Sequence, residues 1–169
     1  EADPFEPNEA VCAKTTLNFV DSVWELFSPW RHGLCCTLVP ENDVKDPPAL
    51  IETLAGARAT RIVLVPSLLR AILDSGEDLQ EKLPKLRHWI SSGEPLPSDL
   101  CKRFSQALPG AVLTNLYGTS EVWDVTRCDS RQRGPGEPLP IGRPIPNARV
   151  YVLDGRQRPV PVGVPGELH

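Results

Sequence analysis

The feature that most constrains the fold is a regular alternation between short apolar runs rich in β-branched residues and longer runs with helical spacing. Such an alternation predicts an α/β fold, with a mostly parallel sheet and helices on both of its faces. The predicted helices are 18–30, a segment that begins at Asp46 and Pro47, "LLRAILDS" behind Ser67 as a candidate cap, and 96–110 with Ser98 as a candidate cap. The predicted strands are 34–40, 59–66, 86–93 and 111–118.

Polar residues follow three of these predicted strands. Right-handed crossovers place the carboxyl ends of parallel strands along one edge of a sheet, where ligands of open α/β folds bind. Those ends contain Pro66-Ser67, the segment 91–94 and the segment 117–121. We therefore expect three small polar clusters to converge at one edge.

The last part of the chain has a different composition, rich in Pro and Gly. Within it, "ARVYVLD" alternates as a half-exposed strand and "DGR" is typical of a turn, which predicts a small antiparallel β region from about 139. We expect two parts, an α/β part over 1–138 and the start of a β subdomain over 139–169, with 129–138 as a candidate for disorder. Both ends look truncated, as in an excerpt of a larger protein.

Composition limits the partners that we expect. The 169 residues are 40% apolar, which is enough to bury a core, and the net charge of −4 with scattered Lys and Arg argues against a nucleic-acid partner. An acidic N-terminus and the absence of any run of ~18 apolar residues argue against export and membrane insertion, so we expect a cytoplasmic protein. The five cysteines contain no CxxC pair and are expected to be reduced thiols, with Cys35 and Cys36 as inert core residues in a buried strand.

The stretch "NLYGTSE" (115–121) combines groups that suit a nucleotide with magnesium. Its glycine permits a sharp turn, its tyrosine offers a face for stacking, its hydroxyls can bind phosphate oxygens, and its carboxylate suits a hard cation. The alternative interpretation is a tight turn with a core tyrosine and a solvated glutamate. The residues alone leave both interpretations open.

This stretch resembles the Asn-x-Tyr-Gly-x-Thr-Glu core motif of the adenylate-forming superfamily, which comprises acyl-CoA synthetases, luciferases and the adenylation domains of non-ribosomal peptide synthetases. Four further segments are similar to motifs of these adenylation domains, in the same order: "FVDSVWE", "SSGEPL", "IGRPIPNARVYVLD" and "VPGELH". Within the superfamily, the likeness is greatest to ebony-like β-alanine-activating synthetases. The fold that the resemblance implies is part of the large N-terminal subdomain of an adenylate-forming enzyme.

The resemblance implies an ATP or AMP site. Tyr117 would stack on adenine opposite the backbone of 93–95, and Asn115 would help to hold the base. Ser120, where threonine is usual, would contact the α-phosphate as a catalytic residue, and Glu121 would bind Mg²⁺. The nucleotide-binding residues assigned in this way are Gly93, Glu94, Pro95, Asn115, Tyr117, Gly118, Thr119 and Ser120.

The resemblance also implies a substrate pocket. In adenylation domains for α-amino acids, the residue after the motif phenylalanine is an aspartate that pairs with the α-ammonium; here Val20 has that place and Asp21 follows. An acid shifted by one residue fits β-alanine, whose ammonium lies one methylene farther from the carboxylate; the alternative is that Asp21 only caps its helix. Asp124 and Val125 receive no role. The substrate-binding residues assigned are Val20, Asp21, Trp24, Ser67, Ile90, Ser92 and Leu116.

The function that we expect is ATP-dependent activation of an amino acid, with transfer to the phosphopantetheine of a carrier domain and ligation to an amine. The chain does not contain the phosphate loop that precedes these motifs in the superfamily, nor the C-terminal catalytic lysine, so we expect it to be inactive alone. Two alternatives remain. One is an acyl-CoA synthetase-like ligase for an amine-free carboxylic acid, and the other is a catalytically inactive, truncated binding module.

Overall fold

The computed structural model describes residues 4–169, so the first three residues of the acidic N-terminal stretch lie outside it. Its main feature is a seven-stranded sheet in the order β2-β1-β3-β4-β5-β6-β7. The first five of these are parallel, whereas β6 and β7 are antiparallel to their neighbours. The strands are β1 (Ala10–Ala13), β2 (Cys35–Leu38), β3 (Arg61–Leu64), β4 (His88–Ser91), β5 (Val112–Thr119), β6 (Trp123–Asp129) and β7 (Arg143–Pro144).

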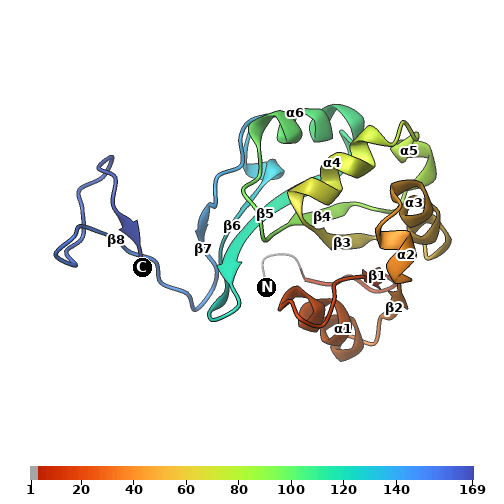
Figure 1. Cartoon of the computed structure of the whole chain (residues 1–169), viewed down its shortest axis with the longest axis horizontal. Coiled ribbons are helices and arrows are strands. Elements are labelled where there is room, and N and C mark those ends of the chain that lie inside the picture. The colour runs from red at the N-terminus through yellow and green to blue at the C-terminus, as the bar shows by residue number, and fades with distance from the viewer. Residues whose placement is uncertain (1–3) are drawn as a thin grey trace.

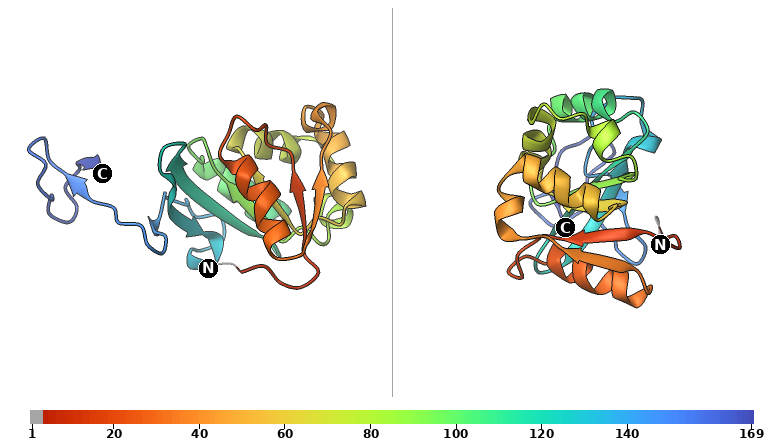
Figure 2. Two further views of the ribbon diagram at one scale, coloured as in Figure 1. Left: turned by 90° about the horizontal axis from the view of Figure 1, so that it is seen from below. Right: turned by 90° about the vertical axis from the view of Figure 1, so that its right-hand side faces the viewer.

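Helices cover the two faces of the sheet unequally. The helices are α1 (Asp21–Arg31), α2 (Glu41–Val44), α3 (Pro47–Gly56), α4 (Pro66–Asp74), α5 (Leu79–Lys82) and α6 (Ser98–Ala107). Helices α3 to α6 lie over one face, and α1 lies across β1 and β2 on the other, as the two views in Figure 2 show. The predicted α/β fold with helices on both faces is confirmed, and the second face keeps an uncovered region beside α1.

The core lies between the sheet and the helices α3, α4 and α6. Alternate residues of the central strands face it because successive side chains of a strand point to opposite faces. Trp89 of β4 is fully buried there, packs edge-to-face on Phe104 with ring centroids 5.7 Å apart, and donates its indole N–H to the Leu86 carbonyl. This one-sided core leaves the opposite residues of the same strands available for a site.

Two predicted helix caps are wrong. Helix α4 begins at Pro66 with Val65 as its N-cap, and α6 begins at Ser98 with Pro97 as its N-cap, and neither cap position makes a side-chain capping bond. Pro66 fixes the backbone at the first helical position, where its missing N–H costs no hydrogen bond, so α4 starts one residue before Ser67. The Ser67 hydroxyl is thereby free to donate to Glu94 instead.

Two strands were not predicted from the sequence, and one segment was predicted wrongly as disordered. Strand β1 has only four residues, and the apolar–polar alternation of β6 breaks after its first four residues, at Arg127. Segment 129–138 contains the end of β6 and a 3₁₀ turn over Ser130–Gln132. The Asp129 carboxylate accepts from the Arg131 backbone, and the Ser130 hydroxyl accepts from the Leu113 N–H. The first bond closes the turn, and the second ties the segment to β5.

All five cysteines are free thiols. The prediction that Cys35 and Cys36 are core residues is wrong, because β2 is the edge strand of the sheet. Cys35 is exposed and Cys36 is half-buried.

The C-terminal part forms a second, two-stranded antiparallel sheet of β8 (Val152–Leu153) and β9 (Glu167–Leu168). It stands apart from the main sheet in Figures 1 and 2, after a linking segment that begins at β7. The turn after β8 is closed by the Asp154 carboxylate, which accepts from the Arg156 and Arg158 N–H groups. The small antiparallel region is confirmed, while the boundary at 138/139 stays a prediction. None of the helices within residues 4–169 has the length and apolar character that a membrane span requires.

Candidate functional site

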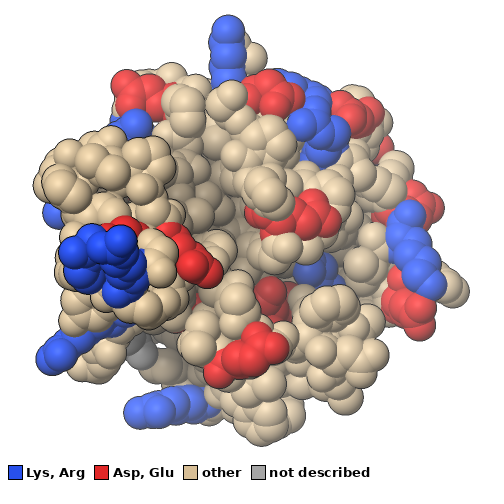
Figure 3. Space-filling model, turned by 60° about the vertical axis from the view of Figure 1, so that its left-hand side comes forward, with Lys and Arg blue, Asp and Glu red and all other residues tan. Residues whose placement is uncertain are grey.

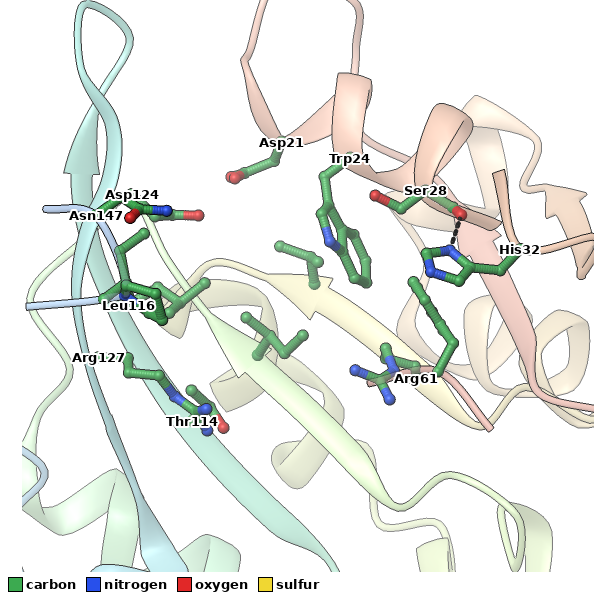
Figure 4. Close-up of a pocket in the computed structure, with 15 residues that line it drawn as sticks. Asp21, Trp24, Ser28, His32, Arg61, Thr114, Leu116, Asp124, Arg127 and Asn147 are labelled. Carbon is green, nitrogen blue, oxygen red and sulfur yellow. Dashed lines mark hydrogen bonds between the residues drawn. The ribbon is translucent and has the colours of Figure 1, made fainter. Parts of the chain in front are cut away.

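A cavity of about 440 Å³ lies over the sheet face that α1 leaves uncovered, and we call it the sheet cavity. In Figure 4, α1 forms one of its walls and the β5–β6 hairpin forms the opposite wall. Its volume falls in the range of small-molecule sites, roughly 300–1,000 Å³. It is lined by Phe5, Asp21, Trp24, Ser28, His32, Arg61, Val63, Ile90, Thr114, Leu116, Asp124, Arg127, Ile145, Pro146 and Asn147.

The floor of the sheet cavity comes from alternate residues of three parallel strands. Arg61 and Val63 belong to β3, Ile90 to β4, and Thr114 and Leu116 to β5. Their neighbours in sequence point the other way into the core, so one set of strands supplies both the core and the cavity floor. The cavity floor therefore depends on three strands that are separate in sequence.

Asp21 projects into the sheet cavity from the first turn of α1. The N-cap of α1 is Val20, in a helical conformation and without a side-chain capping bond, so the capping alternative for Asp21 is wrong. Among residues 4–169, Asp21 makes no hydrogen bond or ion pair. Burial raises the pKa of its carboxyl, and the charge of Lys14 opposes this rise.

The start of α1 is held by other groups of the same motif. The Glu25 carboxylate is fully buried and accepts from the backbone N–H groups of Lys14 and Thr15, at 2.9 Å and 2.7 Å. The Ser22 hydroxyl donates to the Phe19 carbonyl at 2.7 Å. The Glu25 carboxylate is thus bound to the backbone beside β1, and Asp21 is the acid of α1 that lines the sheet cavity.

Asp124 of β6 is a second carboxylate in the sheet cavity, although the sequence analysis assigned it no role. Strand register pairs Tyr117 with Thr126 but Gly118 with Asp124, so Val125 is the extra residue of a β-bulge. Without the bulge, Asp124 and Arg127 would lie on opposite faces of β6, whereas both line the cavity. Burial, and then the charge of Asp21, raise the pKa of Asp124 to about 6.

A second cavity of about 400 Å³ lies at the carboxyl ends of β4 and β5, and we call it the edge cavity. It adjoins the sheet cavity, because Leu116 lines both. The edge cavity is lined by Gly93, Glu94, Pro95, Leu96, Asn115, Leu116, Tyr117, Gly118, Leu139, Pro140 and Ile141. The structure thus brings together six of the eight residues that the resemblance assigned to nucleotide binding.

The residues of the edge cavity are held by a small hydrogen-bond network. Asn115 is buried, and its amide donates to the carbonyls of Leu139 and Pro140 at 3.0 Å and 3.1 Å, so it fixes the wall opposite β4. The Glu94 carboxylate accepts from the Ser67 N–H and hydroxyl. Tyr117 is 37% exposed, which leaves its ring accessible for stacking.

Gly118 is required by the close approach of the two hairpin strands. A Cβ at this position would lie 2.0 Å from the Trp123 carbonyl oxygen and 2.6 Å from the Asp124 Cα, distances that no side chain tolerates. Trp123 itself adopts a left-handed conformation with φ of 60°. The glycine therefore permits the bulge that turns Asp124 into the sheet cavity.

Thr119, Ser120 and Glu121 form the exposed tip of the β5–β6 hairpin and line neither cavity. The hydrogen bond from the Thr119 hydroxyl, and then that from its own backbone N–H, lower the pKa of Glu121. Within the described chain, no group of three or more His, Cys, Asp or Glu residues could hold a metal ion. One ionised carboxylate beside two hydroxyls fits Mg²⁺, which in proteins is commonly bound by one or two carboxylates together with phosphates and water.

Four of the seven residues assigned to substrate binding line the sheet cavity, and the other three line neither cavity. Asp21, Trp24, Ile90 and Leu116 line the sheet cavity, and Trp24 stacks on Phe5 with ring centroids 5.7 Å apart. Three others do not line it: Val20, Ser67 and Ser92. Ser67 binds Glu94, which lines the edge cavity, and Ser92 follows β4 directly and is buried.

The charged residues near the sheet cavity are mostly paired. Arg61 binds Glu9, with the guanidinium 3.0 Å from the carboxylate, and Arg127 binds Asp129 at 2.8 Å. On the face of the molecule in Figure 3, Lys and Arg lie scattered among Asp and Glu, with no continuous stripe of either sign. The two aspartates of the sheet cavity stand out from this pattern, because neither has an ion-pair partner among residues 4–169.

The chain is similar in sequence to a known enzyme family and to several synthetases. A profile of the AMP-binding enzyme family matches residues 1–169. The chain is 41% identical over 177 residues to the beta-alanyl-bioamine nonribosomal peptide synthetase ebony of Drosophila melanogaster, covering 98% of the chain and 20% of that protein. It is 43% identical over 172 residues to the phosphinothricin tripeptide synthetase PhsB of Streptomyces viridochromogenes, covering 99% of the chain and 14% of that protein.

A solved structure gives the same result for the fold. The crystal structure of CmiS6 matches with a TM-score of 0.85 at 27% identity, over 96% of the chain and 40% of CmiS6. The chain spans a fifth or less of the length of the two synthetases that it resembles.

Proposed function

Because the chain belongs to the AMP-binding enzyme family, whose members are ATP-dependent ligases, we propose that it is the central part of an adenylation domain that activates β-alanine. In this proposal, the edge cavity receives the adenine of ATP and the sheet cavity receives the amino acid. The observation that carries the proposal is the adjacency of the two cavities, which share Leu116. Two ligands bound in them would meet at the carboxyl ends of β4 and β5.

The chain's residues would position the reactants and exclude water. Tyr117 would stack on adenine against the backbone of 93–95, and Ser120 would donate its hydroxyl to the α-phosphate. The carboxylate of the amino acid would attack the α-phosphorus, forming an acyl–phosphate bond, and the bond to pyrophosphate would break. Such catalysis depends on oriented donors and on charge stabilisation as negative charge develops. Glu121 is the residue that would hold Mg²⁺, which supplies charge neutralisation between phosphates when bound.

Asp21 supports an amino acid as the substrate of the sheet cavity. A carboxylate in an apolar surrounding is costly unless it meets a cation. Asp21 forms no ion pair among residues 4–169, and the charge of Lys14 offsets the cost of its burial only in part. Ebony is by its name a beta-alanyl-bioamine synthetase, which favours β-alanine over other amino acids for this chain. We further propose transfer of the β-alanyl group to the phosphopantetheine thiol of a carrier domain, and ligation to an amine, by the full-length protein.

The test is ATP–pyrophosphate exchange by the full-length protein. We expect β-alanine to support exchange at least ~10-fold better than α-alanine, because only the longer spacer brings the ammonium to Asp21. The Asp21→Val variant should lose this preference while its KM for ATP stays within about 2-fold of wild type. Equal exchange with propionate, which lacks the amine, would instead support a ligase for amine-free acids. The absence of exchange with any acid would support an inactive binding module.

A further inference from the structure

We propose that Phe5 is a further specificity residue of the sheet cavity, and that it limits the size of the side group that the substrate can carry. The inference rests on the proposed function, because it takes the sheet cavity as the amino-acid site. It deepens that function by naming the favoured substrate class, a short amino acid without a bulky side group. The segment 4–9, which supplies Phe5, lies before all the motifs that resemble those of adenylation domains.

The sheet cavity has two ends that differ in their lining. At one end it shares Leu116 with the edge cavity, so the carboxylate of an amino acid would meet ATP there. In Figure 4, Trp24 lies between Leu116 and the pair of His32 and Arg61, which mark the other end. We call this other end the far end. With its carboxylate near Leu116 and its ammonium at Asp21, a substrate would direct a side group toward the far end.

The aromatic ring of Phe5 occupies the far end. Its centroid lies 5.7 Å from that of Trp24, in a stacked arrangement, and 4.9 Å from that of His32. The Arg61 guanidinium lies over the same ring, 4.6 Å from its centroid. All four residues line the sheet cavity. The ring of Phe5 is therefore held from the side of α1 and from β3, and it forms a fixed wall of the far end.

A buried ion pair holds the segment that carries Phe5. Glu9 is 8% exposed and Arg61 is 3% exposed. The Arg61 guanidinium donates two hydrogen bonds to the Glu9 carboxylate, at 3.1 Å and 3.0 Å, and one to the Pro4 carbonyl, at 3.5 Å. A bidentate pair of this kind fixes direction as well as distance. Residues on both sides of Phe5 are thus tied to β3, which leaves the ring little freedom to withdraw from the cavity.

The fixed ring predicts which substrates the sheet cavity rejects. A phenyl group on the β-carbon of β-alanine would compete with the ring of Phe5 for the far end, and a packed site accepts extra volume only with strain. Displacement of the ring would also remove its contacts with Trp24 and Arg61. β-Alanine carries no side group, so it binds without either cost.

The experiment measures ATP–pyrophosphate exchange by the full-length protein with β-alanine and with each enantiomer of β-phenyl-β-alanine. The quantity compared is the ratio of kcat/KM for the phenyl-substituted acid to kcat/KM for β-alanine. We expect Phe5→Ala to raise this ratio at least ~10-fold over wild type for one enantiomer, because the phenyl group of the substrate fills the space that the lost ring leaves. A ratio that stays at the wild-type value for both enantiomers would overturn the inference.

Phe27→Ala is the matched control. Phe27 belongs to α1, is 59% exposed and lines neither cavity. The substitution removes the same atoms from the protein, and it should leave the ratio at its wild-type value. An equal rise in Phe5→Ala and Phe27→Ala would indicate a general loosening of the structure and would overturn the role of Phe5.

A more conservative variant keeps the inference testable if Phe5→Ala does not fold. Phe5→Leu retains an apolar side chain and removes less volume, so we expect it to raise the ratio several-fold, less than Phe5→Ala. Thermal unfolding establishes that each variant is folded before its exchange is compared. A wild-type ratio in folded Phe5→Leu would contradict the size limit set by the ring.

Failure of the inference differs from failure of the proposed function. Wild-type exchange that is equal for β-alanine and β-phenyl-β-alanine would overturn the inference and leave the function standing, since the ring would then set no limit. Absence of wild-type exchange with any amino acid would overturn the function itself.

Discussion

The edge cavity and the sheet cavity lie side by side, yet they are built in different ways. The edge cavity is lined by three short segments, 93–96, 115–118 and 139–141, and backbone and accessible side chains dominate it. The sheet cavity is lined by Phe5, by residues of α1 and His32 after it, by residues of four strands, and by the segment 145–147. It contains two carboxylates that form no ion pair among residues 4–169. A site for a common ligand can therefore be local in sequence, whereas a site that selects among similar ligands depends on tertiary structure.

The largest effect should come from the residue that both cavities need. Gly118→Ala places a Cβ 2.0 Å from the Trp123 carbonyl, and we expect it to lower the free energy of unfolding by about 3 kcal/mol. Exchange with every acid should fall, since the hairpin carries walls of both cavities. Gly56→Ala is the matched control, because its Cβ would meet no atom within 4 Å, and thermal unfolding of both variants is the measurement. Equal melting temperatures for the two variants would contradict the role of the hairpin.

Two aromatic substitutions should separate the cavities from each other. Tyr117→Ala should raise the KM for ATP by roughly 10-fold with little change in the KM for β-alanine, because it removes a stacking face from the edge cavity. Trp24→Ala should raise the KM for β-alanine by a similar factor and leave the KM for ATP nearly unchanged. Steady-state exchange kinetics measure both constants. If each substitution raised both constants equally, the division into two sites would be wrong.

The smallest predicted effect is a gain in the stability of the fold in the Asp124→Asn variant. The folded-state pKa of Asp124 is raised to about 6 by burial, then by Asp21, so ionisation is less favourable in the folded chain than in the unfolded one. Wild type therefore loses stability as the pH rises through the interval between the two pKa values. Asp124→Asn should be more stable than wild type by about 1 kcal/mol above this interval and no more stable below it.

Urea titrations at a pH on each side of this interval measure the effect. Asp46→Asn is the control, since its carboxylate is exposed. A destabilised Asp124→Asn variant at neutral pH would contradict the prediction that the buried carboxylate of Asp124 lowers the stability of the fold.

The sequence was sufficient to predict most of the fold and the edge cavity. The spacing of apolar residues along the chain predicted β2 to β5 and four of the helices, because strands and helices repeat their apolar residues at different intervals. The two strands that were not predicted are short or mixed in polarity, and their pairing comes from their neighbours in the sheet. The predicted nucleotide residues lie in two contiguous motifs, so most of them remained together when the chain folded.

The sheet cavity could be predicted only in part. Asp21 and Trp24 belong to one motif and face the cavity together, whereas Ser67 is turned toward Glu94 by the early start of α4. Asp124 could not be predicted, because its direction depends on a one-residue bulge that the pattern of β6 does not indicate. A bulge reverses the face of a residue without changing its place in the sequence.

The most direct test is a crystal structure of the full-length protein with a stable β-alanyl-adenylate analogue in which a sulfamate replaces the phosphate. The account predicts adenine stacked on Tyr117 in the edge cavity and the ammonium in the sheet cavity, within hydrogen-bonding distance of Asp21. Adenine outside the edge cavity, or an ammonium directed to solvent with Asp21 turned away, would contradict it.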